Sequence, residues 1–106
     1  MSYDVIISEK ARYDIVNIYR YIAIELCEPE TARNKISDIR ATLENLNFMP
    51  ERHPLYRDEP LKSMGIRILP FEKYLILYYV DNLKSEVNIV RIIYGGKDLK
   101  TQLDEI

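Results

Sequence analysis

Three short apolar runs in the second half of the chain constrain its fold more than any other feature. The first begins at Gly65, the second spans Tyr74–Tyr78, and the third begins at Glu86. Each run is rich in β-branched and aromatic residues, is too short for a buried helix, and is separated from the next by a turn-like break. The pattern therefore predicts an antiparallel meander of three strands.

Positive charges interrupt this predicted meander. Arg67 lies in the first run, Arg91 in the third, and Lys97 just beyond the third. A cation inside a core-forming strand is costly unless it faces solvent, a charged partner or a ligand. We therefore expect the functional site to lie on this sheet.

The first half of the chain predicts one strand and two helices. Residues 2–7 alternate as a strand does, Ser8 is a favourable N-cap, and helical periodicity then continues to about Cys27. A second helix is expected from Pro29 to Leu46, since proline suits the first turn of a helix. Because the link is so short, the two helices should form an antiparallel hairpin. The first helix has one apolar face, made of Ala11, Ile15, Ile18, Ile22 and Leu26.

The remaining segments read as a long connection and a short tail. Residues 47–64 hold three prolines and scattered charges, which favours an irregular loop. Residues 98–106 have helical spacing, and form a short terminal helix or pack only when a partner is present. The order is β-α-α-β-β-β-(α) in a single domain, residues 1–106. We predict an α+β class, with a small, mostly antiparallel sheet and the helical hairpin on one face. The other face is expected to stay open to a ligand or protein.

Composition excludes several kinds of protein. The 106 residues carry 15 Lys and Arg against 17 Asp and Glu, a net charge of −2, which argues against a general nucleic-acid-binding surface. One cysteine and one histidine exclude an internal disulfide and a Cys/His zinc site, and no cofactor is expected. No run reaches the roughly 18 apolar residues of a membrane span, and the N-terminus lacks signal-peptide features. We expect a cytoplasmic protein with no membrane partner.

The order of elements and three motifs resemble the RelE/ParE superfamily of toxins from type II toxin–antitoxin systems. The motifs are the Gly65–Arg67 entry to one strand, the Tyr74–Tyr78 strand, and the segment Val87–Asp98, which ends in the closing pattern Ile92–Asp98. The resemblance covers nearly the whole chain. The Tyr-Leu-Ile-Leu-Tyr strand and the Gly-Gly-Lys-Asp ending look nearer to the ParE-like, plasmid-stabilisation branch.

This resemblance implies a growth-inhibiting toxin that a cognate antitoxin neutralises, with operator DNA reached only through the antitoxin. It leaves the target open. RelE-like members cleave mRNA in the ribosomal A site, whereas ParE-like members inhibit DNA gyrase. A third possibility is a degenerate, non-toxic member of the family.

The two toxic activities assign different roles to the same residues. In a metal-independent endoribonuclease, Arg67 would stabilise the transition state, Lys97 would bind phosphate, and Tyr94 would transfer a proton. In a binding toxin, Arg67, Arg91 and Lys97 would contact the target. Strand alternation places Arg91 and Tyr94 on opposite faces unless a bulge intervenes. His53, between two prolines, is expected to be a solvated loop residue that could still swing into the site.

The acidic net charge of the chain favours a toxin that acts by binding over one that cleaves RNA. An enzyme that threads among ribosomal RNA phosphates usually carries strong positive charge, whereas this chain is acidic and has only Lys62 as a lysine in the 47–64 loop. We therefore prefer a toxin that binds DNA gyrase, with the ribosome-dependent ribonuclease as the alternative.

Overall fold

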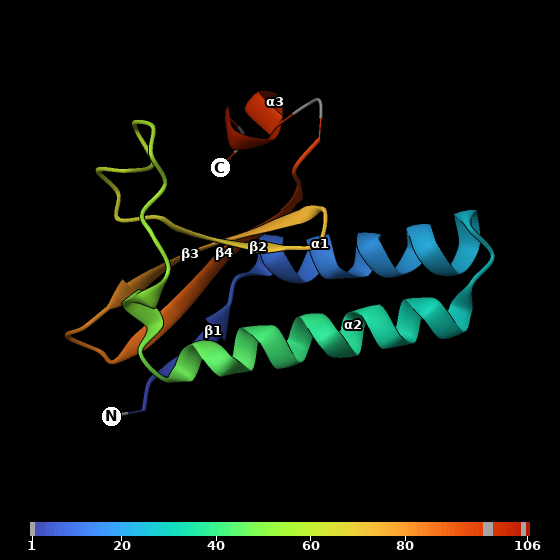
Figure 1. Cartoon of the computed structure of the whole chain (residues 1–106), viewed down its shortest axis with the longest axis horizontal. Coiled ribbons are helices and arrows are strands. Elements are labelled where there is room, and N and C mark those ends of the chain that lie inside the picture. Colours follow the sequence, from blue (N-terminus) through green and yellow to red (C-terminus); the bar gives the residue numbers. More distant parts are fainter. Residues whose placement is uncertain (1, 97–98, 105) are drawn as a thin grey trace.

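The computed structural model describes residues 2–96, 99–104 and 106, and it confirms the predicted α+β class and order of elements (Figure 1). The elements are β1 (Asp4–Ile7), α1 (Glu9–Arg20), α2 (Pro29–Glu44), β2 (Arg67–Phe71), β3 (Tyr74–Asp81), β4 (Glu86–Tyr94) and α3 (Leu99–Asp104). Among the helices in this part of the chain, none is long and apolar enough to cross a membrane.

The four strands form one sheet in the order β1-β4-β3-β2. The meander of β2, β3 and β4 is antiparallel, as predicted, and β1 joins the outer side of β4 in parallel orientation. The short β1 pairs only with Glu86–Ile89 of β4. The last part of β4 therefore has no strand beside it on that edge.

Ser8 fixes the start of α1 and its place on the sheet. Its Oγ accepts a hydrogen bond from the N–H of Ala11 at 3.0 Å, which caps the helix, and donates to the carbonyl of Val90 at 2.9 Å. The helix predicted to reach Cys27 changes near its end into a π-helix, Tyr21–Glu25. Short π-helical segments often occur at functional sites.

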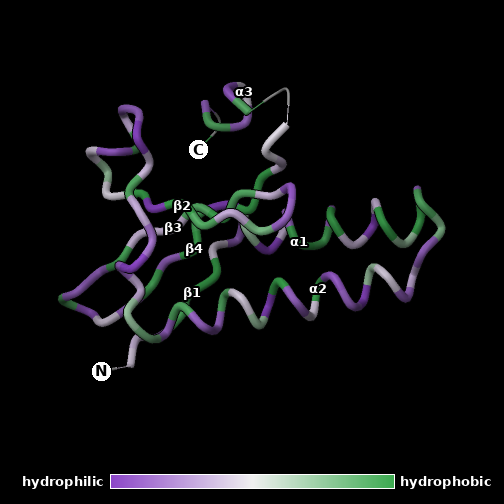
Figure 2. Tube along the Cα trace, viewed as in Figure 1, coloured by the Kyte–Doolittle hydropathy of each residue, from purple (hydrophilic) through white to green (hydrophobic). Residues whose placement is uncertain are grey.

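The main core lies between the helical hairpin and one face of the sheet. Hydrophobic and hydrophilic residues alternate along α1 and α2, as expected for helices with one buried side (Figure 2). The buried side chains of this core are Ala11, Ile15, Ile18, Ile22, Ala32, Ile39, Leu43, Leu46, Ile76, Tyr78, Val87, Ile89 and Ile92.

The second face of the sheet is covered, so the expectation of an open face is wrong. Buried Leu61, Ile66, Leu77 and Ile93 form a second cluster there, and side chains of the tail pack against it. The tail folds as α3, on the side of the sheet away from the helical hairpin (Figure 1). The reason is that Leu99, Leu103 and Ile106 together supply an apolar side that this face can bury.

A β-bulge in β4 changes which side chains face the helices. Leu77 of β3 lies opposite Arg91, whereas the next residue, Tyr78, lies opposite Ile89, so Val90 is an extra residue in β4. After the bulge the alternation shifts by one, and Ile92 faces the main core together with Ile89.

Candidate functional site

A cavity of about 610 Å³ lies where the last part of β4 approaches α1. Its walls come from α1, the start of the π-helix, the β2–β3 turn, β3, β4 and α3, so they join segments distant in sequence. The lining residues are Asp14, Asn17, Ile18, Tyr21, Lys73, Tyr74, Arg91, Ile92, Tyr94 and Gln102. Two residues that the sequence singled out, Arg91 and Tyr94, both line this cavity. The bulge at Val90 precedes both of them and leaves their alternation unchanged; Arg91 reaches the cavity at the unpaired strand edge, through its ion pair with Asp14.

Arg91 is held by a nearly buried ion pair with Asp14 of α1. Its Nε donates to Oδ2 at 2.8 Å and its Nη2 donates to Oδ1 at 2.9 Å, which makes the contact bidentate. The two side chains are 15% and 11% exposed. Asp14 Oδ2 also accepts the N–H of Ile92 at 2.9 Å, where β4 has no neighbouring strand. Asp14 therefore fixes both the guanidinium and the strand.

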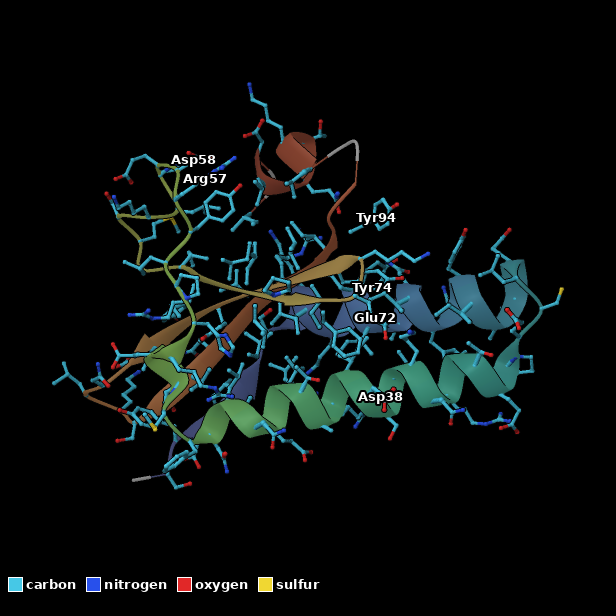
Figure 3. All side chains as sticks on the ribbon, in the orientation of Figure 1. Asp38, Arg57, Asp58, Glu72, Tyr74 and Tyr94 are labelled. Atoms are coloured by element: carbon cyan, nitrogen blue, oxygen red, sulfur yellow. The ribbon has the colours of Figure 1, made fainter. Side chains whose placement is uncertain are left out.

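Aromatic rings form another wall of the cavity. The rings of Tyr74 and Tyr94 pack edge to face, with centroids 6.3 Å apart (Figure 3). Burial raises the pKa of Tyr74 above its usual value. Tyr94 itself is half exposed. The side-chain amide of Gln102 donates to the carbonyl of Tyr94 at 2.8 Å and accepts its N–H at 3.2 Å, so α3 closes the strand edge as a neighbouring strand would.

The cavity is locally positive on an acidic chain. Among its lining residues, Lys73 and Arg91 are cations and Asp14 is the only anion, which leaves one net positive charge. Lys73 is exposed and makes no ion pair within the described residues. The site combines one available ammonium group with aromatic and amide surface, which suits contact with an anionic or polar group of a partner.

Arg67 lies outside this cavity, and its side chain is hydrogen-bonded to the loop before β2. Its Nη1 donates to the carbonyls of His53 at 2.7 Å and Glu51 at 3.3 Å, and its Nη2 lies 3.5 Å from the Glu51 carboxylate. The side chain is 19% exposed. Tyr78, directly opposite Arg67, donates its hydroxyl to the carbonyl of Pro50 at 2.6 Å. Burial raises the pKa of Tyr78 to about 12.

Arg67 and Tyr94, two of the residues proposed for an acid–base set, lie apart along the sheet. Arg67 lies opposite Tyr78 and Tyr94 lies opposite Tyr74, so their positions are four residue steps apart along β3. At about 3.3 Å per residue this is roughly 13 Å. Lys97 lies outside the described residues. His53 stays in the loop, where burial and the charge of Arg52 lower its pKa.

Sequence reasoning missed Asp14, Lys73, Tyr74 and Gln102 as parts of the site. Asp14 lies beside the apolar face of α1. An acidic residue at the edge of a buried face often has a cationic partner, and Arg91 is the cation that it binds. Gln102 carried no signal, because its role depends on how the tail folds back.

A family model matches most of this sequence. The model for the ParE toxin of the type II toxin–antitoxin system parDE matches residues 5–99, which is most of the chain. The chain belongs to the ParE toxin family. A search of the curated proteins gives no significant match.

Two solved structures share the fold of this ParE-family chain. One is a chromosomal ParDE toxin–antitoxin system from P. aeruginosa, with 23% identity and a TM-score of 0.73 over 90% of this chain and 98% of that chain. The other is the toxin–antitoxin complex RelBE2 from Mycobacterium tuberculosis, with 20% identity and a TM-score of 0.62 over 89% and 99%. Both confirm the expected RelE/ParE-like architecture.

Proposed function

We propose that this ParE-family toxin arrests growth by binding DNA gyrase, without chemistry of its own, and that a cognate antitoxin neutralises it in the cytoplasm. The observation that carries the proposal is the separation of Arg67 from Tyr94 along β3. A metal-independent ribonuclease needs cations and an acid–base group around one phosphate, whereas Arg67 is held by carbonyls of the loop before β2 and Tyr94 lines the cavity beside α1.

The hydrogen bonds of both arginines support the same conclusion. The Arg67 guanidinium binds main-chain carbonyls, and the Arg91 guanidinium binds Asp14. Each arginine therefore stabilises the protein's own structure instead of pointing unpaired into a phosphate site. Side chains held in this way lose little conformational freedom when a partner binds, so they suit a protein-binding surface.

The cavity at the end of β4 is the contact site that we propose for gyrase. Lys73 supplies the accessible positive charge, and Tyr94 supplies exposed aromatic area. Tyrosine and arginine are the residue types that most often dominate protein interfaces. Lys97 follows closely in sequence and remains a predicted contact. We propose that the antitoxin covers this same site.

The test is a supercoiling assay with purified gyrase, run beside a reconstituted translation reaction in which mRNA ends are mapped. We expect wild-type protein to inhibit supercoiling and to leave mRNA intact. Lys73→Glu should weaken inhibition about tenfold or more, because it reverses the charge of the site. Lys62→Glu, an equal charge change at an exposed position outside the cavity, is the control and should inhibit as wild type does.

Two results would contradict this proposal. New mRNA ends that appear only with ribosomes would replace it with the ribonuclease. Intact mRNA together with unimpaired supercoiling would leave a degenerate member of the family.

A further inference from the structure

The β2–β3 turn carries the exposed cation of the cavity next to an anion of its own. The turn consists of Glu72 and Lys73, between the last residue of β2 and the first residue of β3. Neighbouring side chains of opposite charge attract each other, and an ion pair between these two would neutralise Lys73. The structure instead shows Glu72 bound to another residue, while Lys73 lines the cavity.

The partner of Glu72 comes from α2. The Nζ of Lys35 donates a hydrogen bond to Oε1 of Glu72, so an ion pair joins the helical hairpin to the turn. The Lys35 side chain is the less exposed of the two, at 22% against 47%. Glu72 lies at the same end of the sheet as Tyr74 and Tyr94, beside the cavity (Figure 3). A helix therefore holds a carboxylate that stands at the margin of the site.

The backbone of Glu72 indicates that its side chain is the reason for a glutamate here. Its φ of 53° lies in the left-handed region, which the common two-residue hairpin turns require at their first central position. Glycine, asparagine and aspartate adopt this conformation with less strain than glutamate does. The contact that glycine could not make is the ion pair with Lys35.

The end of β4 fixes the rest of the turn. The N–H of Gly95 donates to the carbonyl of Lys73 at 2.8 Å. A Cβ atom at position 95 would lie 3.3 Å from that oxygen, so glycine permits this close approach. The next residue, Tyr74, packs edge to face against Tyr94. The main chain at Lys73 is therefore held, and the freedom that remains is that of its side chain.

We infer that Lys35 is a positioning residue, which keeps Lys73 available to a partner by binding the neighbouring carboxylate that would otherwise neutralise it. This inference rests on the proposed function, in which Lys73 is the cation that contacts gyrase. Asp14, the anion in the cavity lining, is occupied by Arg91 in the same way that Glu72 is occupied by Lys35. The cavity thus presents a positive charge because both neighbouring carboxylates are bound by other cations.

This role differs from a purely structural one in the direction of a single effect. If the ion pair only stabilised the fold, loss of either member would weaken binding alike. If Lys35 withholds Glu72 from Lys73, loss of Lys35 weakens binding, whereas loss of the Glu72 charge does not, because no anion is then released beside Lys73.

The first measurement is the concentration of full-length protein that halves supercoiling by purified gyrase. Lys35→Ala should raise this concentration about two- to fivefold, which is the range expected for an exposed ion pair. Glu72→Gln should not raise it, and Lys35→Ala/Glu72→Gln should return it to the wild-type value. Arg33→Ala is the matched control: it removes a positive charge and an ion pair, with Glu30, from the same helix, and should leave inhibition unchanged. Circular dichroism melts should show all these proteins folded.

The second measurement needs no gyrase. Acetic anhydride labels the neutral form of an amine, and a carboxylate close to an ammonium group favours its charged form. Labelling of Lys73, followed by mass spectrometry of peptides, should slow about two- to fivefold in Lys35→Ala. It should return to the wild-type rate in Lys35→Ala/Glu72→Gln and stay at that rate in Arg33→Ala.

The outcomes separate the two proposals. Equal losses of inhibition in Lys35→Ala and Glu72→Gln, or unchanged labelling of Lys73 in Lys35→Ala, would overturn the positioning role while leaving gyrase as the target. A wild-type protein that does not inhibit gyrase would overturn the proposed function, and the labelling rates would still decide whether Lys35 keeps Lys73 unpaired.

Discussion

Replacing Asp14 with alanine tests how the candidate site is held together. Asp14 accepts two hydrogen bonds from Arg91 and one from the N–H of Ile92, all between 2.8 and 2.9 Å. The substitution removes the counter-charge of a nearly buried guanidinium and leaves a strand N–H without its acceptor.

The size of the effect follows from these contacts. A buried N–H that loses its partner costs about 1–3 kcal/mol, and breaking a fully buried ion pair costs about 3–5 kcal/mol. Since Arg91 is 15% exposed and lines an open cavity, water can solvate part of its charge. We therefore expect Asp14→Ala to lower the free energy of unfolding by about 2–3 kcal/mol, which corresponds to a fall in Tm of about 10–15 °C for a domain of this size.

Urea denaturation followed by circular dichroism measures the change. Asp38→Ala is the matched control, because Asp38 is an exposed carboxylate on α2, and it should change stability by less than about 0.5 kcal/mol. Asp14→Ala/Arg91→Met should recover much of the loss, since an apolar side chain of similar length needs no counter-charge. If Asp14→Ala differed from Asp38→Ala by less than about 1 kcal/mol, the assignment of Asp14 as the organiser of the site would be refuted.

Three further predictions concern other contacts. The pKa of Tyr78 is about 12 in the folded state, above its usual value, so the unfolded chain ionises first, and stability should fall by up to about 3 kcal/mol as pH rises from about 10 through about 12. Denaturation of Tyr78→Phe across that range should show a clearly smaller fall, the part that remains coming from Tyr74, whose pKa is also raised. Ser8→Ala should cost about 1–2 kcal/mol in urea denaturation, because it removes both the cap and the bond to Val90, whereas exposed Ser37→Ala should be neutral. Gln102→Ala should speed hydrogen exchange of the Tyr94 amide about tenfold with buried Ile76 unchanged; equal rates at Tyr94 in both proteins would contradict the role given to Gln102.

The candidate site was only partly accessible from the sequence. Arg91 was identified as a cation interrupting an apolar strand, and Tyr94 from its position in the resemblance to the toxin family. A bulge was named as the condition for their lining one site, but the bulge at Val90 precedes both residues, and it is the pairing with Asp14 that holds Arg91 at the cavity. The position of that bulge could not be read from the run Val87–Tyr94, because apolar residues on both sides of Arg91 suit either face of the sheet. Arg67 was identified too, but its partners are main-chain carbonyls of a loop, and carbonyls carry no sequence signature.

What the sequence determined by itself is the set of local elements. Apolar residues at helical spacing, the capping Ser8 and the β-rich runs specify the two helices and the meander, because those signals act within a few residues. Tertiary structure alone decided that β1 adds beside β4, that α3 covers the second face of the sheet, and that Asp14 meets Arg91. Such pairings join residues far apart along the chain, and their free energy exists only once burial and hydrogen bonding bring the segments together.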